Sequence, residues 1–299
     1  NEEAAQVTGL LKMNGIPARL IQSNDEFNLY NLLEIRTFLD HLLLDRDVRV
    51  IGEEEWEEAK RGLKDQFRGS SNLELCLNMI NDFEAVNPKY KYATDLEIFV
   101  RESKMEDFYG EKTETVFVST MHKAKGREFD NVFLLLDRYD MEGMGDENRR
   151  LLYVALTRAK SNMSIHCNSG FFEPFRVRGI VRECDRKAYT PPNQLVLQLS
   201  HRDVWLDYFS SARNMVSQLK SGDPLTIDGE WCRNAKGKAV LKFSRNMINR
   251  FEAWRKKNYV PKSATVRWIV FWKKEDPDQE FKIVLPEILL ERGNDSQYI

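Results

Sequence analysis

The chain has 299 residues and a mass of 35.1 kDa, of which 42% are hydrophobic and 31% are charged. This length predicts about two domains of roughly 100–200 residues each, and the composition is typical of a packed globular protein. No apolar run approaches the ~18–20 residues that span a bilayer, which argues against membrane insertion.

The cysteines and the N-terminal sequence indicate the cellular compartment in which the protein is expected. Cys76, Cys167, Cys184 and Cys232 form no CxxC pair, which argues against a zinc ribbon, a redox motif and a disulfide framework. The opening stretch NEEAAQVTGLL does not resemble a secretion signal, so we expect a cytoplasmic protein with reduced thiols. Because the sequence begins with Asn1 rather than methionine, we also expect a piece of a longer polypeptide.

Charge is distributed unevenly along the chain. Residues 187–299 contain 19 basic and 13 acidic residues, whereas residues 1–186 contain 26 basic and 34 acidic residues. Between Arg233 and Lys274, thirteen lysines and arginines accompany the single acid Glu252. A basic segment of this kind is a candidate surface for polyanions.

The first third of the chain has mainly helical periodicity. Apolar residues recur at helical spacing, with Gly15 and Pro17 ending the first helix and Asn28 as a candidate cap for the second. The pattern predicts a short strand at 19–21 and helices over 2–13, 29–44, 53–67, 72–85 and about 95–100. We interpret about 45–110 as a helical insertion.

Beyond residue 115 the pattern changes to short apolar runs. The runs TVFVST, NVFLLL and MSIHC predict three buried strands, with a helix over 146–160 between the last two. Buried strands that alternate with helices indicate a parallel sheet covered on both faces. Pro191 and Pro192 mark the best domain boundary. Beyond them the pattern predicts helices over 204–219 and 245–257 and strands at 224–228, 238–243, 264–272 and 281–285.

Two blocks carry the strongest functional signal. The first is STMHKAKGREFD at residues 119–130, a strand end that runs into a glycine-containing turn. The second is ENRRLLYVALTRAK at residues 147–160, an amphipathic helix with a basic end. In order and spacing they resemble motifs V and VI of the UvrD/Rep class of superfamily 1 DNA helicases, typically T-x-H-x-A-K-G-x-E-F and E-x-R-R-L-x-Y-V-x-x-T-R-A.

The resemblance covers roughly residues 1–168 and implies an α/β fold. It implies a RecA-like parallel sheet flanked by helices in a motor domain at 1–186, with the short helical insertion. Residues 187–299 are then a smaller, basic accessory domain of α+β or barrel-like architecture. The insertion is far shorter than the accessory domain of Rep-type enzymes, and Asn148 and Ala155 depart from frequent family residues.

The resemblance also implies roles for individual residues at the nucleotide. Arg158 corresponds to the arginine finger that contacts the γ-phosphate of ATP, because a planar guanidinium holds two phosphate oxygens and stays charged. Glu128 corresponds to a ribose contact, Gly126 to a close backbone approach, and Tyr153 to a residue that helps to hold the cleft. Alternatively, Arg158 is a cation at a helix C-terminus and Glu128 is a solvated acid.

A second group of residues corresponds to the grip on DNA. Thr120 and His122 occupy positions where the family contacts the DNA backbone, and Lys125 occupies the adjacent cleft position. His122 is equally well explained as a satisfied turn histidine. Arg149 and Arg150 correspond to cleft residues, but a salt bridge to Asp146 or Glu147 is the alternative that we favour.

The basic domain offers a separate candidate surface for DNA. The predicted helix over 245–257 has an apolar face, and we expect Arg245, Arg250, Arg255, Lys256 and Lys257 largely outside. The candidate phosphate contacts among them are Arg245, Arg255, Lys256 and Lys257. We expect Trp268, Phe271 and Trp272 to lie in the core rather than to stack on bases. An ordinary solvated face, or a dock for the acidic first domain, also explains these cations.

Half of an ATPase site is missing. No GxxxxGK[ST] occurs, and no Asp-Glu pair follows an apolar strand to hold magnesium. Together with this absence, the resemblance implies the C-terminal fragment of an ATP-dependent DNA helicase, which uses ATP and Mg²⁺ only with an upstream Walker A motor domain and binds a single DNA strand in the motor groove. For this fragment alone we expect no bound cofactor or metal and no membrane partner. The alternatives are a non-catalytic binding module, a helicase–nuclease subunit, or a unit appended to a RecQ-like motor.

Overall fold

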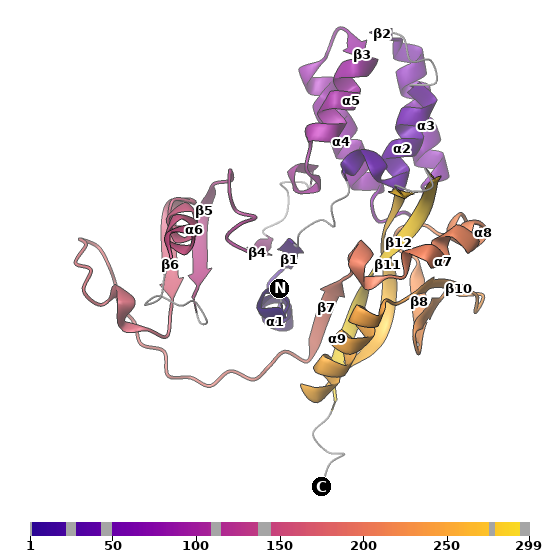
Figure 1. The fold of residues 1–299 in the computed structure, drawn as a ribbon. Helices are drawn as coiled ribbons and strands as arrows, with labels where there is room; N and C mark the ends of the chain where they lie inside the picture. The colour runs from indigo at the N-terminus through magenta and orange to yellow at the C-terminus, as the bar shows by residue number, and fades with distance from the viewer. Residues whose placement is uncertain are drawn as a thin grey trace. The chain divides into compact units, whose positions relative to one another are not determined.

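The computed structural model describes residues 2–21, 28–42, 50–108, 115–136, 145–274 and 279–293. The chain forms two compact units. Figure 1 traces the chain through both of them. The first unit consists of Asn1–Gln22 and Val116–Pro191. The second unit consists of Ser23–Thr115 and Pro192–Ile299. No described helix is long and apolar enough to cross a membrane.

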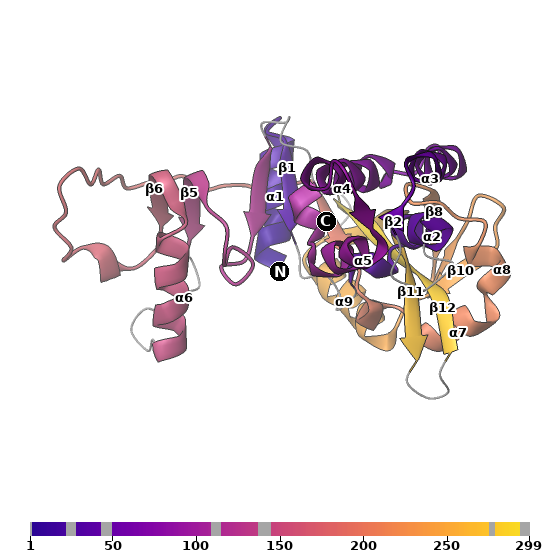
Figure 2. The ribbon, with the colours of Figure 1, turned by 90° about the horizontal axis from the view of Figure 1, so that it is seen from above.

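The first unit is built on two parallel strand pairs, which confirms a mixed α/β fold. Strand β1 pairs with β4, and β5 pairs with β6. Helix α1 lies beside β1, and α6 connects β5 to β6 (Figure 2). The elements of this unit are α1 (Glu2–Met13), β1 (Ala18–Ile21), β4 (Val116–Ser119), β5 (Phe129–Leu135), α6 (Asp146–Leu156), β6 (Ala159–His166) and the 3-10 helix η3 (Gly170–Phe172).

The alternation of side chains along β5 determines which face meets α6. Leu134 and Leu136 are buried against Leu152 and Ala155 of α6. Phe133 points to the other face and is 66% exposed. Successive residues of a strand point to opposite faces, so one register places a continuous apolar cluster beneath the helix.

The second unit contains a helical segment with an aromatic centre. Its elements are η1 (Leu29–Asn31), α2 (Leu33–Leu42), β2 (Val50–Ile51), α3 (Glu53–Gln66), α4 (Leu73–Val86), β3 (Lys91–Tyr92), α5 (Ala93–Glu102) and η2 (Met105–Phe108). Trp56 of α3 is fully buried between Phe38 and Phe83, with ring centroids 5.3 and 5.8 Å away. Asn28 accepts from the Tyr30 amide and so caps η1, while α2 begins only at Leu33.

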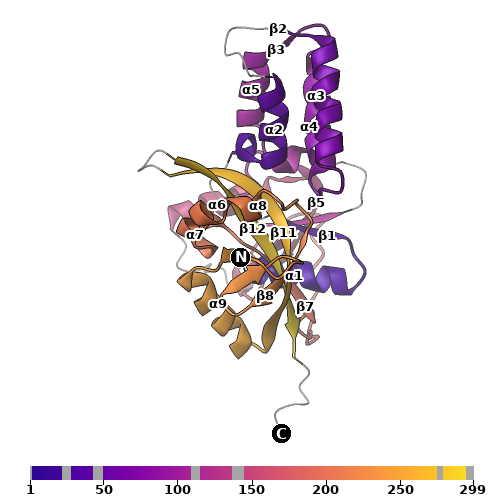
Figure 3. The same ribbon diagram turned by 90° about the vertical axis from the view of Figure 1, so that its right-hand side faces the viewer.

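The rest of the second unit is an antiparallel sheet with helices. The strand order is β10-β9-β8-β11-β12-β7, and every pair is antiparallel. The long hairpin of β11 and β12 forms the spine of this sheet (Figure 3). The elements are β7 (Gln194–Gln198), η4 (His201–Asp203), α7 (Leu206–Ser211), α8 (Arg213–Val216), β8 (Pro224–Asp228), β9 (Trp231–Arg233), β10 (Ala239–Lys242), α9 (Arg245–Lys256), β11 (Tyr259–Lys274) and β12 (Gln279–Arg292).

The helical segment packs directly on this sheet within the second unit. Leu32 forms a β-bridge with Val270 of β11, and the side-chain amide of Asn72 donates to the Arg267 carbonyl at 3.1 Å. The Ser71 amide donates to the Ser221 carbonyl at 2.9 Å. The units are therefore grouped differently from the expected domains at 1–186 and 187–299, because residues 23–115 bury surface against residues that follow Pro191.

Several individual elements differ from their expected ranges. The helix expected over 146–160 ends at Leu156, because Ala159 already pairs with Phe129 as the first residue of β6. Strands β7 and β9 were not predicted, whereas β8 occupies the expected residues 224–228. Residues 43–44 of the expected second helix lie outside the described residues.

Candidate functional site

The first block forms a tight turn between β4 and β5. The Lys123 amide donates to the Thr120 carbonyl at 3.0 Å, and the Arg127 amide donates to the Ala124 carbonyl at 3.2 Å. Gly126 has φ +85°, a left-handed conformation that side chains with a Cβ rarely adopt. The chain can therefore turn at this position because glycine adopts the left-handed conformation without steric cost.

The predicted DNA and nucleotide residues of this block are mostly accessible. His122, Lys125, Gly126 and Glu128 are exposed, and Thr120 is half-buried. Exposed imidazole, ammonium and carboxylate groups on one turn are available to a ligand. Their exposure alone is equally compatible with a solvated loop.

The second block forms α6 and the turn after it. Leu152 and Ala155 face the sheet, so the opposite face of the helix is open to solvent. Tyr153 lies on this outer face and is 68% exposed. Arg149 and Arg150 are also exposed, and neither makes an ion pair among the described residues, so the expected bridges to Asp146 or Glu147 are absent there.

Arg158 lies in the turn between α6 and β6 and is held by its own surroundings. Its Nε donates to the Val154 carbonyl at 2.8 Å, its Nη1 to the Arg127 carbonyl at 3.1 Å, and its Nη2 to the Thr157 hydroxyl at 2.9 Å. The bond to Val154 is the kind that a cation makes at a helix C-terminus. Because a guanidinium has five N–H groups, two remain after these three bonds in the described part of the chain.

Strand pairing brings the ends of the two blocks together. Phe129 is in register with Ala159, and the Phe129 amide donates to the Arg158 carbonyl at 2.9 Å. Together with the hydrogen bond from Arg158 to the Arg127 carbonyl, this pairing places Arg158 beside the turn that contains Gly126 and Glu128. The structure therefore places Arg158 next to the turn that holds two of the other predicted nucleotide residues.

The four predicted cations of the basic domain all lie on or next to α9. Arg245, Arg255, Lys256 and Lys257 are exposed, while the apolar face of the helix is buried. Arg255 is paired with Glu252 at 2.6 Å, and Lys257 lies over the Trp254 ring at 4.8 Å. The helix therefore presents a basic face whose charge is only partly neutralised.

Two expectations for neighbouring residues have different outcomes. Arg250 was expected largely outside, but it is half-buried and donates to Asp203 at 2.7 Å, because that carboxylate is buried and needs a cation. Trp268 is 3% exposed, which confirms its place in the core. Phe271 and Trp272 are half-buried.

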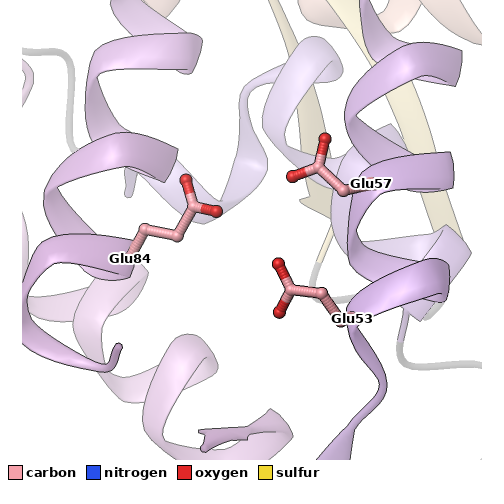
Figure 4. Close-up of side chains that lie close together, drawn as sticks. All are labelled: Glu53, Glu57 and Glu84. Atoms are coloured by element: carbon pink, nitrogen blue, oxygen red, sulfur yellow. The ribbon is translucent and has the colours of Figure 1, made fainter. Parts of the chain in front are cut away.

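A group of carboxylates in the helical segment was not predicted from the sequence. One carboxylate oxygen from each of Glu53, Glu57 and Glu84 lies within 4.8 Å of the others (Figure 4). Lys60 bridges Glu57 and Glu84 at 3.0 Å each, and Lys91 contacts Glu53 at 2.9 Å. Two lysines thus offset most of the charge of the three carboxylates, and the cluster is best explained as an ion-pair network.

Comparison with known proteins agrees with the motif geometry. Residues 34–170 match the family model of the UvrD-like helicase C-terminal domain. The chain is thus similar to this domain over 137 of its 299 residues. The match spans the helical segment and both motif blocks, so the short insertion belongs to the matched region.

Several curated helicases are similar to the chain. DNA helicase II of Escherichia coli is 28% identical over 215 residues, which cover 66% of this chain and 28% of that protein. The probable DNA helicase II homolog of Rickettsia conorii is 30% identical over 178 residues, covering 54% and 24%. The putative ATP-dependent DNA helicase YjcD of Bacillus subtilis is 27% identical over 159 residues, covering 47% and 21%. The chain thus matches about a quarter of the length of these relatives.

Sequence reasoning missed the partners of Arg158. Two of its three acceptors are backbone carbonyls, of Val154 and Arg127, and no residue type signals a backbone acceptor. The third, the Thr157 hydroxyl, stands next to the arginine in the ThrArgAla sequence. That adjacency was the available signal.

Proposed function

We propose that this chain is the C-terminal part of an ATP-dependent DNA helicase, in which Arg158 is the arginine finger. The observation that carries the proposal is the junction of the two motif blocks, where Arg158 adjoins the turn 120–128. A guanidinium that is fixed in place and retains two N–H groups is suited to stabilise charge on a phosphate.

The residues present fit one side of a nucleotide. Arg158 would contact the γ-phosphate, Glu128 the ribose hydroxyls, Gly126 would allow close approach, and Tyr153 would help to close the cleft. The missing GxxxxGK[ST] motif would come from an upstream motor domain. Mg²⁺ bound with ATP neutralises phosphate charge, and its ligands would also belong to that domain.

The same proposal assigns the DNA contacts. Thr120, His122 and Lys125 would hold a single strand in the motor groove through its phosphates. Arg245, Arg255, Lys256 and Lys257 would form a second, electrostatic contact on the basic domain. We also propose that residues 187–299 act as an accessory domain to the motor.

The test uses the full-length enzyme with Arg158→Ala. Removal of charge stabilisation in the transition state should lower DNA-stimulated ATP turnover by about 10³-fold or more while DNA binding is largely retained. Arg178→Ala is the matched control, because Arg178 is an exposed arginine of the same unit. Normal turnover in Arg158→Ala would refute the assignment.

A second candidate function is a non-catalytic motor-like module that binds DNA or protein. The three local hydrogen bonds of Arg158 favour it, since they give the side chain a structural role. In that case the complete natural polypeptide should show no ATP turnover with or without DNA. The experiment above therefore separates the two candidates.

A further inference from the structure

An exposed tryptophan lies beside the basic hairpin of β9 and β10 in the second unit. Trp205 precedes α7, and its amide donates to the Lys242 carbonyl at 2.8 Å. Val204 forms a β-bridge with Phe243, so the segment lies along the outer edge of β10. The backbone of Trp205 is thus fixed by two adjacent contacts with the sheet.

A lysine lies between two tryptophan rings at this edge. The Lys242 Nζ is 4.7 Å from the centroid of the Trp205 ring and 5.2 Å from that of Trp231. Trp231 and Lys242 are direct cross-strand partners, and Tyr208 packs on Trp231 at 5.2 Å. This stacking orders the rings before any ligand is present.

Trp205 remains accessible in spite of these contacts. It is 46% exposed, whereas Trp254 and Trp268 of the same unit are 1% and 3% exposed. An ordered, half-exposed indole presents a flat apolar surface to solvent. Such a surface stacks on an unpaired nucleobase, because every base has a π-face.

The charges of the β9–β10 hairpin favour a polyanion. Lys236 and Lys238 at the tip of the hairpin are exposed, and neither makes an ion pair among the described residues. Arg233 is paired with Asp228 at 2.7 Å, and Lys242 with Glu230 at 3.3 Å, so these two cations are partly neutralised. The unpaired lysines provide the attraction to phosphate, and the tryptophan provides the contact to the base.

We propose that Trp205, with Lys242 and Trp231 behind it, is a base-stacking platform for single-stranded DNA. The inference rests on the proposed helicase function, which supplies single-stranded DNA as the ligand. Duplex DNA is a poorer fit, because its bases are already stacked and shield their faces. An acidic peptide would satisfy the lysines but would leave the indole surface unused.

The test is fluorescence anisotropy in the absence of ATP. It compares a labelled oligothymidylate with a labelled abasic oligonucleotide of equal length. Loss of stacking in Trp205→Ala should weaken oligothymidylate binding by about 5- to 150-fold and leave abasic binding unchanged. Trp205→Phe, which keeps an aromatic face, should lose less. Tyr90→Ala is the control, because Tyr90 is a 64% exposed aromatic residue of the same unit.

Each outcome of this assay supports or overturns the proposed base-stacking platform. The platform would be overturned if Trp205→Ala and the unchanged chain bound oligothymidylate with equal affinity. It would also be overturned if Trp205→Ala lost as much affinity for the abasic strand, or if polyglutamate fully displaced oligothymidylate from the unchanged chain. Trp205→Phe keeps the test valid if the alanine variant does not fold. The assay measures DNA binding rather than ATP turnover. Its result therefore does not depend on whether Arg158 is the arginine finger.

Discussion

The guanidinium of Arg158 donates to the carbonyl of Arg127, with Nη1 and the oxygen 3.1 Å apart. This hydrogen bond joins the two motif blocks across 31 residues of sequence. It fixes the arginine to the turn that precedes Glu128. A residue that is held in this way is ordered before a ligand arrives, at the expense of part of its hydrogen-bonding capacity.

We predict that Arg158→Lys keeps the charge but loosens this junction. An ammonium cannot reproduce three divergent N–H bonds, so the free energy of unfolding should fall by about 1–3 kcal/mol. Urea unfolding of the present chain measures this effect. Arg178→Lys is the control, and equal stability of the two variants would show that the local bonds contribute nothing.

Gly126 provides a prediction that depends only on the backbone. A Cβ at this position would meet nothing within 4 Å, so the penalty of Gly126→Ala comes from its φ of +85° and should be about 1–2 kcal/mol. Gly62→Ala, inside α3, should instead stabilise the chain by up to about 1 kcal/mol. Chemical unfolding should therefore give opposite signs, and a stabilising Gly126→Ala would contradict the left-handed turn.

The sequence predicts local structure well where an apolar pattern is long. Helices α3, α4 and α9 lie within a residue or two of their expected ranges. The end of α6 was wrong because the pairing of Ala159 with Phe129, a contact distant in sequence, decides that residue. Strand β9 has three residues, too few for a recognisable alternation.

Contacts between distant segments were beyond sequence reasoning. Asn72 and Arg267 are 195 positions apart, and nothing in either residue type indicates their hydrogen bond. The association of the helical segment with the C-terminal sheet therefore appeared only in the structure. At the candidate site, the motif residues were predictable because two blocks preserve a recognisable order, whereas the backbone partners of Arg158 were not.

A substitution of Asn72 tests the association of the helical segment with the C-terminal sheet. Its side chain is 6% exposed, so Asn72→Ala removes a buried donor from the Arg267 carbonyl and should lower the free energy of unfolding by about 1–3 kcal/mol. Asn246→Ala, at an exposed position of α9, should change it by less than about 0.5 kcal/mol. Indistinguishable urea midpoints would mean that this contact does not hold the helical segment to the sheet.

Cys232 predicts a pH dependence of stability. Burial raises the pKa of its thiol to about 12, above the ordinary value of 9.0. Because the folded state holds the proton more tightly, the stabilising contribution is complete below pH 9 and is lost as pH rises toward 12. The stability difference between the unchanged chain and Cys232→Ala should therefore shrink between pH 8 and pH 10.5. Cys184→Ala, at an exposed thiol, is the control.

The lysine in the carboxylate network provides the last prediction. Burial lowers the pKa of Lys60, but hydrogen bonds to Glu57 and Glu84 outweigh this effect and leave it raised. Lys60→Met should cost about 1–3 kcal/mol, because Glu84 then keeps only the Trp56 indole as partner among these groups. Millimolar Ca²⁺ should raise the melting temperature of Lys60→Met but not that of the unchanged chain, since carboxylates without their lysine attract a cation. Lys64→Met, on the exposed side of α3, is the control. Equal stabilisation of all three proteins by Ca²⁺ would show that Lys60 does not occupy the cation position.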